Sequence, residues 1–340
     1  MHNINLNYKS KLLLFVFVFI ILFFFSIFYT AHYPNINGGD EVFYMNLATK
    51  MIGLPFWDRV VIGITQMLNF GWPVFLSYYP DFSLESNIPL TFVRIFILTI
   101  SVFYFYRSYK IHFSIMILLI PFLFQASIYA GTLIRDDLIF SFYLIVLGLL
   151  KNLSTKTLPL ALICFIFLIT LRVPLIISSI PFLIMLMIRL IKRSKSAIYF
   201  VPFLLLSFYY LIFYLGIANY ITSAFLSSLD INFVDMIRPF LSPINPFLVS
   251  ENIRYDNPII FILMSPAKLF FIISSFLLIF YKNKFSYYNQ VMFILFSAIP
   301  YMFIAENLGM RQALPIQFCL YAIIINSSLN IRTTKSKRFA

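Results

Sequence analysis

Long runs of apolar residues, separated by short segments that carry the charges, dominate the chain. A helix that crosses the roughly 30 Å hydrocarbon core of a bilayer needs about 20 mostly apolar residues. Ten stretches meet or approach this length, and they are residues 12–31, 88–106, 113–130, 137–150, 157–171, 173–188, 197–218, 258–281, 289–305 and 312–328. The pattern predicts an all-α fold, a polytopic membrane helix bundle of about ten transmembrane helices that forms a single integral membrane domain over residues 1–340, without a soluble C-terminal domain.

Two of the connections between these runs are long, residues 32–87 and 219–257. In the first, apolar residues recur at helical spacing over 42–52 and more weakly over 60–70, which predicts interfacial helices lying on the membrane. The second is rich in proline, which favours an ordered but irregular segment. Two lysines precede the first apolar run, but this run is longer than a signal-peptide core and no A-x-A-like site follows. We therefore expect a retained signal anchor.

Composition supports the assignment to the membrane. Apolar residues make up 61% of the 340 residues and charged residues 11%, against about 45–50% and 25% in soluble globular domains. These proportions exclude a water-soluble enzyme. The two cysteines, Cys164 and Cys319, both lie inside apolar runs, which predicts neither a disulfide framework nor a cysteine metal cluster.

The charges divide unequally between the two sides of the predicted topology. With both termini in the cytoplasm, 16 of the 25 Lys and Arg residues fall on the inner side, as the positive-inside rule requires. The outer side carries the other nine basic residues and all 12 acidic residues, a formal charge of −3. Chemistry that needs a carboxylate is therefore expected only outside. The inner basic residues are scattered over short turns, which favours contact with anionic lipid headgroups and argues against a nucleic-acid partner.

The most informative acidic cluster follows the first apolar run, in the segment Asn35-Ile-Asn-Gly-Gly-Asp-Glu-Val-Phe-Tyr44. The two glycines allow a sharp turn, and Asp40 and Glu41 then open a predicted helix, where the helix dipole favours carboxylates. One interpretation is that these acids only cap the helix. The other is that they take part in chemistry on the outer side.

A second cluster, Arg135-Asp136-Asp137, lies at the tip of the hairpin between the third and fourth runs. The fourth run has about 14 residues, or roughly 21 Å of helix, so this tip is expected below the outer membrane surface. Charges at that depth are costly unless they pair or face water and substrate. They form either an Arg–Asp pair with a helix cap or a functional site, in which the adjacent carboxylates share a proton or bind a divalent cation.

Three further cations are expected to be recessed. Arg172 lies between two apolar runs that together cover only residues 157–188, a hairpin too short to reach the far side, so it needs an anion. Lys268 lies within a later run and Arg311 at the start of the last one. Each cation either snorkels to the outer headgroups or binds an anionic ligand. Taken as a set, they favour one shared anionic ligand.

Outer carboxylates beside recessed cations suit one class of reaction. Arg and Lys hold the phosphate or diphosphate of a lipid-linked substrate, since Arg matches phosphate oxygens with paired hydrogen bonds. A carboxylate accepts the proton of an attacking hydroxyl as a sugar leaves its phosphate. Aromatic rings that stack on sugars are available near the first long loop, although the aromatic belt at the membrane interface explains most of them. They include Tyr33, Trp57, Trp72, Tyr78 and Tyr79.

The order of these motifs resembles the GT-C superfamily of polyprenyl-phosphate-sugar-dependent membrane glycosyltransferases, which includes protein O-mannosyltransferases and the aminoarabinose transferase of lipid A. The matching features are, in chain order, Asp40-Glu41-Val-Phe-Tyr44, Arg94, Arg135-Asp136-Asp137, Arg172 and Arg311-Gln-Ala-Leu-Pro315. The resemblance implies that Asp40 or Glu41 is the catalytic base, that Asp136 or Asp137 is the second acid, and that Arg172 and Arg311 bind phosphate. The wider set expected to contact substrate consists of Tyr44, Arg94, Arg135, Arg172, Arg254, Lys268 and Arg311.

Two other functions fit the same charges. The chain also resembles Wzy-like polymerases of surface polysaccharides, in which Arg238, Arg254 and Arg311 would act on glycans carried by undecaprenyl diphosphate. A transporter or flippase for a lipid-linked sugar would use the charges as a binding cavity without cleaving anything. The expected location is a bacterial inner membrane, with the active site on the periplasmic side. The expected partners are a polyprenyl-phosphate-linked sugar, a glycan, lipid or protein acceptor, and membrane lipids, with room for a divalent cation at the outer carboxylates.

Overall fold

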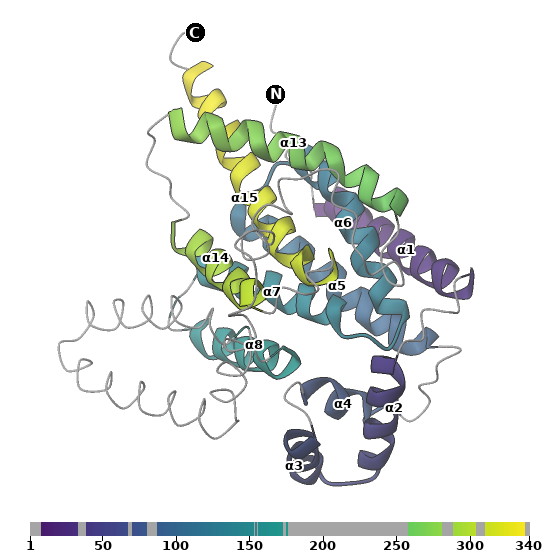
Figure 1. Cartoon of the computed structure of the whole chain (residues 1–340). Helices are drawn as coiled ribbons and strands as arrows, with labels where there is room; N and C mark the ends of the chain where they lie inside the picture. Colours follow the sequence, from purple (N-terminus) through teal and green to yellow (C-terminus); the bar gives the residue numbers. More distant parts are fainter. Residues whose placement is uncertain are drawn as a thin grey trace, which may run out of the picture.

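The computed structural model describes residues 8–32, 39–66, 70–79, 87–152, 154, 156–172, 175, 258–280, 288–303 and 310–336. All regular secondary structure in these ranges is helical, in agreement with the predicted all-α class (Figure 1). The predicted runs 173–188 and 197–218 lie outside the described residues except for Leu175, and the loop 219–257 lies outside them entirely.

Helices occupy the other eight predicted runs. They are α1 (Tyr8–His32), α5 (Ile88–Tyr109), α6 (Phe113–Gly131), α7 (Asp136–Lys151), α8 (Leu158–Leu171), α13 (Pro258–Phe280), α14 (Tyr288–Phe303) and α15 (Met310–Ser336). Proline in the first turn of α5 and of α8 fits these helix starts, where its missing N–H costs nothing. Three stretches are long and apolar enough to cross a membrane, Leu12–Ala31, Ile88–Tyr109 and Phe113–Gly131. Shorter apolar stretches occur in α8, α13 and α15, and a total of ten spans stays a prediction.

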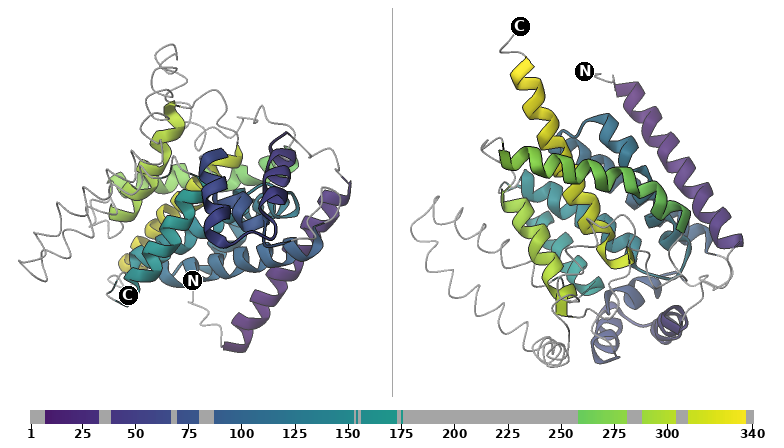
Figure 2. Two further views of the ribbon diagram at one scale, coloured as in Figure 1. Left: turned by 90° about the horizontal axis from the view of Figure 1, so that it is seen from below. Right: turned by 45° about the horizontal axis from the view of Figure 1, so that its top comes forward.

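The helices at the edge of the bundle turn apolar side chains outward. α1 packs on α5 and α6, and α13 packs across α6 and α15 (Figure 2). Their exposed residues are large and apolar, among them Leu13, Phe24 and Phe28 on α1 and Ile259, Ile262 and Phe276 on α13. A continuous apolar exterior of this kind is costly in water and is typical of a surface that faces lipid.

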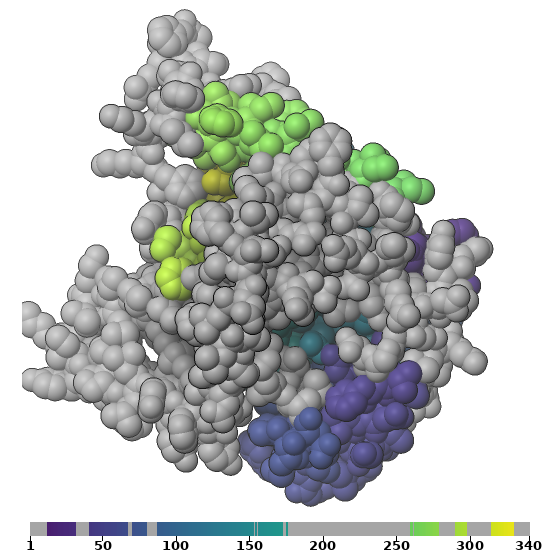
Figure 3. Space-filling view, in the orientation of Figure 1, coloured from purple at the N-terminus to yellow at the C-terminus, as the bar shows by residue number. Residues whose placement is uncertain are grey.

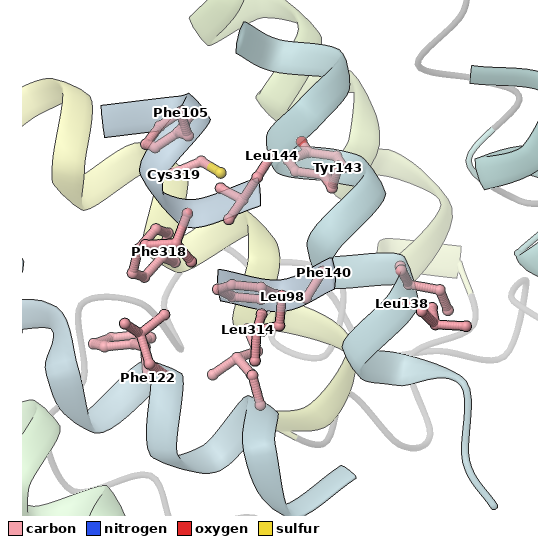
Figure 4. Packing of buried hydrophobic residues seen from close by; sticks show 14 of the residues in the cluster. Leu98, Phe105, Phe122, Leu138, Phe140, Tyr143, Leu144, Leu314, Phe318 and Cys319 are labelled. Atoms are coloured by element: carbon pink, nitrogen blue, oxygen red, sulfur yellow. The ribbon is translucent and has the colours of Figure 1, made fainter. Parts of the chain in front are cut away.

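The core of the bundle forms where α5, α6, α7 and α15 meet. Phe318 of α15 lies 5.1 Å from Phe140 of α7 and 6.2 Å from Phe105 of α5, measured between ring centroids. Figure 4 shows these rings turned toward one another, with Leu98, Leu144 and Cys319 beside them. Cys319 and Cys164 are both free and buried. The core therefore fixes how α5, which carries the buried Arg94, and α7, which carries the buried Asp136 and Asp137, lie against each other.

The antiparallel helices give the bundle two chemically different ends. At one end the side chain of Asn326 on α15 holds the turn between α5 and α6, because it accepts from the backbone N–H of His112 at 3.2 Å and donates to the carbonyl of Tyr109 at 3.4 Å. Lys110 in this turn lies close enough to Lys151, at the end of α7, that partial burial and the charge of Lys110 together lower the pKa of Lys151. We call this the basic end.

At the opposite end a group of short helices covers the bundle. The group consists of α2 (Gly39–Met51), α3 (Phe56–Gln66) and α4 (Gly71–Leu76), which project together at the lower side of Figure 3. We call this the acidic end, because the acidic residues of the described part of the chain lie there, in α2, α3 and the first turn of α7. Arg59 holds the group together, since its side chain donates to the carbonyls of Leu54 at 2.7 Å and Ser77 at 2.9 Å. The helices α2 and α3 overlap the two helical segments predicted in the first long loop, and their place at the membrane interface stays a prediction. The helix α4 was not predicted, and Gly71 and Trp72 at its start contact the bundle directly.

One close contact attaches the short helices to the bundle. At Gly71, which opens α4, an added Cβ would lie 2.2 Å from Oγ1 and 3.0 Å from the backbone carbonyl carbon of Thr170 on α8. A change of rotamer moves only the side chain of Thr170, so it cannot relieve the clash between the added Cβ and the Thr170 backbone. The sequence Gly71-Trp72-Pro73 therefore needs glycine because of the space available, not because of its backbone torsions.

We expect Gly71→Ala to lower the free energy of unfolding by about 1–3 kcal/mol, the usual cost of overpacking, because α4 must move away from α8. Thermal unfolding of the detergent-solubilised protein measures this. Gly53→Asn is the control, since Gly53 has a positive φ of 82° but nothing within 4 Å of an added Cβ, and Asn tolerates that conformation. Equal losses in the two variants would contradict the close contact.

Candidate functional site

Buried charges from four separate parts of the chain converge at the acidic end. We call them the charged cluster: Glu41 from α2, Arg94 from α5, Arg135, Asp136 and Asp137 from the start of α7, and Arg172 directly after α8. All six side chains are buried. Their formal charges, three negative and three positive, cancel, which is the condition under which several buried charges can be tolerated together.

Arg94 makes several hydrogen bonds from its guanidinium. Its Nε donates to Oδ2 of Asp137 at 2.9 Å, and its Nη2 donates to the carbonyl of Tyr129 at 2.8 Å and forms an ion pair with Oδ1 of Asp137. It also donates to the carbonyls of Thr132 and Ile134. Arg94 and Asp137 are both 0% exposed. The guanidinium therefore ties α5 to the turn between α6 and α7, residues 132–135.

Two side chains from the short helices hold the same turn at Leu133. The indole N–H of Trp72 donates to the Leu133 carbonyl at 2.7 Å, and a carboxylate oxygen of Glu41 accepts from the Leu133 N–H at 2.8 Å. The ring of Trp72 also lies over Arg94, with 4.8 Å between the guanidinium carbon and the ring centroid. The turn is thus fixed from the bundle by Arg94 and from the covering helices by Trp72 and Glu41.

Arg135, the last residue of this turn, contacts α2 as well. Its guanidinium donates to the hydroxyl of Tyr44 and lies over the tyrosine ring, 5.0 Å from the ring centroid. Tyr44 is one turn after Glu41, so the two side chains lie on the same face of α2. The segment Asp40-Glu41-Val-Phe-Tyr44 thereby places an acid and a phenol against a single turn of the bundle.

The two adjacent aspartates have different arginine partners. Asp137 pairs with Arg94, whereas Oδ1 of Asp136 accepts from Nη2 of Arg172. Arg172 follows the last residue of α8 in an extended conformation, with φ −148° and ψ 91°. Its side chain is buried, as expected from the short hairpin, and forms an ion pair with Asp136. The cluster is therefore assembled from pairs that join different helices.

The remaining predicted site residues differ in how they relate to this cluster. Asp40 lies in the first turn of α2, next to Glu41. Arg311 opens α15, seven residues or about 10 Å of helix before Phe318. From Phe318, α15 runs toward Asn326 at the basic end. The start of the helix, which includes Arg311, therefore lies toward the acidic end. Arg254 and Arg238 lie outside the described residues.

Lys268 is a separate case. It lies in the middle of α13, which packs on α6 and α15, and its side chain is 1% exposed. This burial argues against the alternative that Lys268 snorkels to the headgroups, because a snorkelling side chain reaches the surface. The place of Lys268 in a shared substrate site stays a prediction.

Trp72 has a role that the sequence did not indicate. It was grouped with aromatic residues of the first loop that stack on sugars or line the membrane interface, but its ring is fully buried between Arg94 and the turn. The neighbouring Gly71 and Pro73, which favour a tight start of α4, were the available signal. Trp57, in contrast, is 73% exposed, as an interfacial tryptophan would be.

Among the described residues, no three His, Cys, Asp or Glu side chains come together as a metal site requires, so the expected divalent cation stays a prediction. The acids that do converge are bonded to arginines and to backbone amides. Comparisons of the chain with protein-family models, with curated proteins and with solved structures gave no match.

Proposed function

We propose that this chain is a membrane glycosyltransferase that moves a sugar from a polyprenyl-phosphate carrier to an acceptor on the outer face of the membrane. The single observation that carries the proposal is the charged cluster, in which acids and arginines from four parts of the chain meet at one end of the bundle. Buried ionisable groups in a membrane protein are costly and mark functional sites by default. The same residues carry the resemblance to the GT-C superfamily.

The proposed reaction needs an anion site and a base. An acceptor hydroxyl attacks the anomeric carbon of the sugar, the bond from that carbon to the phosphate oxygen breaks, and the lipid phosphate leaves with the bonding electrons. Arg172 and Arg311 stabilise the negative charge that the leaving phosphate acquires. Asp40 or Glu41 accepts the proton of the hydroxyl, and Tyr44 and Arg135 orient the sugar phosphate beside them.

The base assignment is tested by Asp40→Asn and Glu41→Gln, made singly. One of the two should lose about 10²–10⁴-fold in transfer rate, the usual contribution of a general base. Gln keeps an oxygen that accepts from the Leu133 N–H, so Glu41→Gln should keep the turn in place. Transfer of radiolabelled sugar from isolated membranes to lipid or polymer acceptors is the measurement, and Asp58→Asn, which removes an exposed acid of α3, is the matched control.

Full transfer by both variants would remove this mechanism. The product of the same assay separates the alternatives, because a polymerase would give a ladder of lengthened undecaprenyl-linked oligosaccharides. A flippase would move a labelled lipid-linked sugar across vesicles without forming a glycosidic bond. Either of these products in place of single-sugar transfer would contradict the proposal.

A further inference from the structure

One exposed tyrosine of the covering helices lies against a buried arginine. Tyr78, two residues after the end of α4, is 51% exposed. The guanidinium carbon of Arg59 lies 4.1 Å from the centroid of the Tyr78 ring. Such a cation–π contact attracts the guanidinium to one face of the ring and covers that face. The exposed part of Tyr78 therefore includes the opposite face of its ring.

The arginine behind this ring is bonded on several sides. The Nε of Arg59 donates to the carbonyl of Leu54 at 2.7 Å, and its Nη1 donates to the carbonyl and the hydroxyl of Ser77, each at 2.9 Å. The backbone N–H of Tyr78 donates to the carbonyl of Phe75 at 3.2 Å. The ring and its support are thus fixed before a ligand arrives, so binding has fewer side chains to order and costs less.

An exposed aromatic face that is fixed in this way suits a sugar ring. One side of a pyranose carries mainly C–H groups, and packing this side flat on an aromatic face removes apolar area from water. The hydroxyls lie around the edge of the sugar, where they keep their contacts with water. Tyrosine serves such contacts well, because it supplies a large and rigid surface with few rotatable bonds.

A line of aromatic rings connects this tyrosine to the charged cluster. The ring of Trp72 lies over Arg94, and Phe75 stacks on Trp72 with 5.6 Å between centroids. Tyr79 lies 5.4 Å from Phe75, again between centroids, and Tyr78 is its neighbour in the chain. Six residues separate Trp72 from Tyr78, or roughly 9 Å at the rise of a helix. A short glycan on Tyr78 therefore lies at the same end of the bundle as the buried acids and arginines.

We propose that Tyr78, backed by Arg59, is a stacking surface for a sugar ring of a glycan acceptor. The role of this sugar as the acceptor rests on the proposed function, whereas the stacking itself does not. The charged cluster supplies arginines, which suit the phosphate of the donor. The exposed ring of Tyr78 suits a neutral sugar, so the two substrates use chemically different parts of the acidic end.

Binding of simple sugars tests the stacking without any transfer reaction. The probes are the methyl glycosides of glucose, galactose, mannose and N-acetylglucosamine, followed by saturation-transfer NMR with the protein in nanodiscs, because alkyl glycoside detergents would compete. Tyr78→Ala should weaken binding by about three- to tenfold, the usual size of one aromatic contact. Tyr78→Phe keeps the ring and should bind like wild type.

A second exposed ring of the same group of helices gives the control. Trp57 is 73% exposed and packs edge-on against Phe56, with 5.1 Å between ring centroids. Trp57→Ala removes an exposed aromatic ring but leaves Tyr78 and Arg59 in place, so sugar binding should match that of wild type. Size-exclusion chromatography shows whether each variant is folded. Should Tyr78→Ala fail this test, Tyr78→Leu carries the same comparison, because it keeps apolar volume without a planar face.

The transfer assay then separates this proposal from the proposed function. Weaker sugar binding by Tyr78→Ala, together with a raised acceptor KM and an unchanged kcat, supports both. Weaker sugar binding without any transfer by wild type supports the stacking surface and contradicts the glycosyltransferase. The stacking surface is overturned if wild type binds none of the four probes, if Tyr78→Ala binds them like wild type, or if Trp57→Ala loses as much affinity as Tyr78→Ala.

Discussion

Arg94→Met is expected to destabilise the folded protein by about 3–5 kcal/mol, the usual cost of removing one partner of a buried ion pair. Met fills much of the volume of the arginine side chain but supplies none of its donors. Asp137 would then be a buried anion without its cation, and the carbonyls of Tyr129, Thr132 and Ile134 would lose their bonds to Arg94. Such a loss is a large part of the roughly 5–15 kcal/mol that stabilises a typical protein. The yield of folded protein and its thermal unfolding in detergent measure the effect.

A double variant shows whether the ion pair is responsible. Arg94→Met with Asp137→Leu removes both charges, and such replacements of a whole buried pair are often nearly neutral, so we expect it to regain much of the lost stability. Arg107→Met is the matched control, since Arg107 lies on the same helix but is exposed, and should change stability by less than about 0.5 kcal/mol. If the double variant is no more stable than Arg94→Met alone, the loss comes from the carbonyl bonds instead.

Trp72→Ala should cost about 3–5 kcal/mol, as truncations of buried aromatic residues do. The ring is fully buried, stacks on Phe75 with 5.6 Å between ring centroids, and lies over Arg94. Its removal opens a cavity between α4 and the bundle and takes the indole donor away from the Leu133 carbonyl. Thermal unfolding measures the loss, and hydrogen exchange of the amides at residues 132–135 should rise because the turn is less firmly held.

The other tryptophan of the chain, Trp57, provides the control for the stability of Trp72→Ala. Trp57 is 73% exposed, so Trp57→Ala should change stability by less than about 0.5 kcal/mol. Trp72→Phe retains a ring but not the indole N–H, and its loss should be smaller, about 1–3 kcal/mol for a buried carbonyl that has lost this donor. Similar stabilities for Trp72→Ala and Trp57→Ala would contradict the role of Trp72 at the turn.

The positions of the eight helices of the bundle followed closely from the sequence, because each one occupies an apolar run between charges. The predicted run 157–171 coincides with α8, Leu158–Leu171, and the predicted run 137–150 lies within α7, Asp136–Lys151. The short α4 escaped prediction because its six residues carry no periodicity that could be recognised, and its position depends on a contact with Thr170 about a hundred residues away.

The membership of the charged cluster was also largely predictable, since charge inside an apolar chain is rare and has few acceptable locations. The pairing inside the cluster was not. Successive residues of a helix point about 100° apart, so Asp136 and Asp137 must face different neighbours. Which neighbour each one meets depends on how α5 and α8 pack on α7. For the same reason, the sequence left open which carboxylate of the pair acts.

The order of the pairs along the chain has a consequence for biosynthesis. Arg94 precedes Asp137 by 43 residues, and Asp136 precedes Arg172 by 36. At about 5–20 residues per second, each charge emerges from the ribosome roughly 2–9 seconds before its partner. During that interval α5 carries a bare cation and α7 a bare anion, so the insertion machinery or an earlier helix has to shelter these charges until the next hairpin arrives.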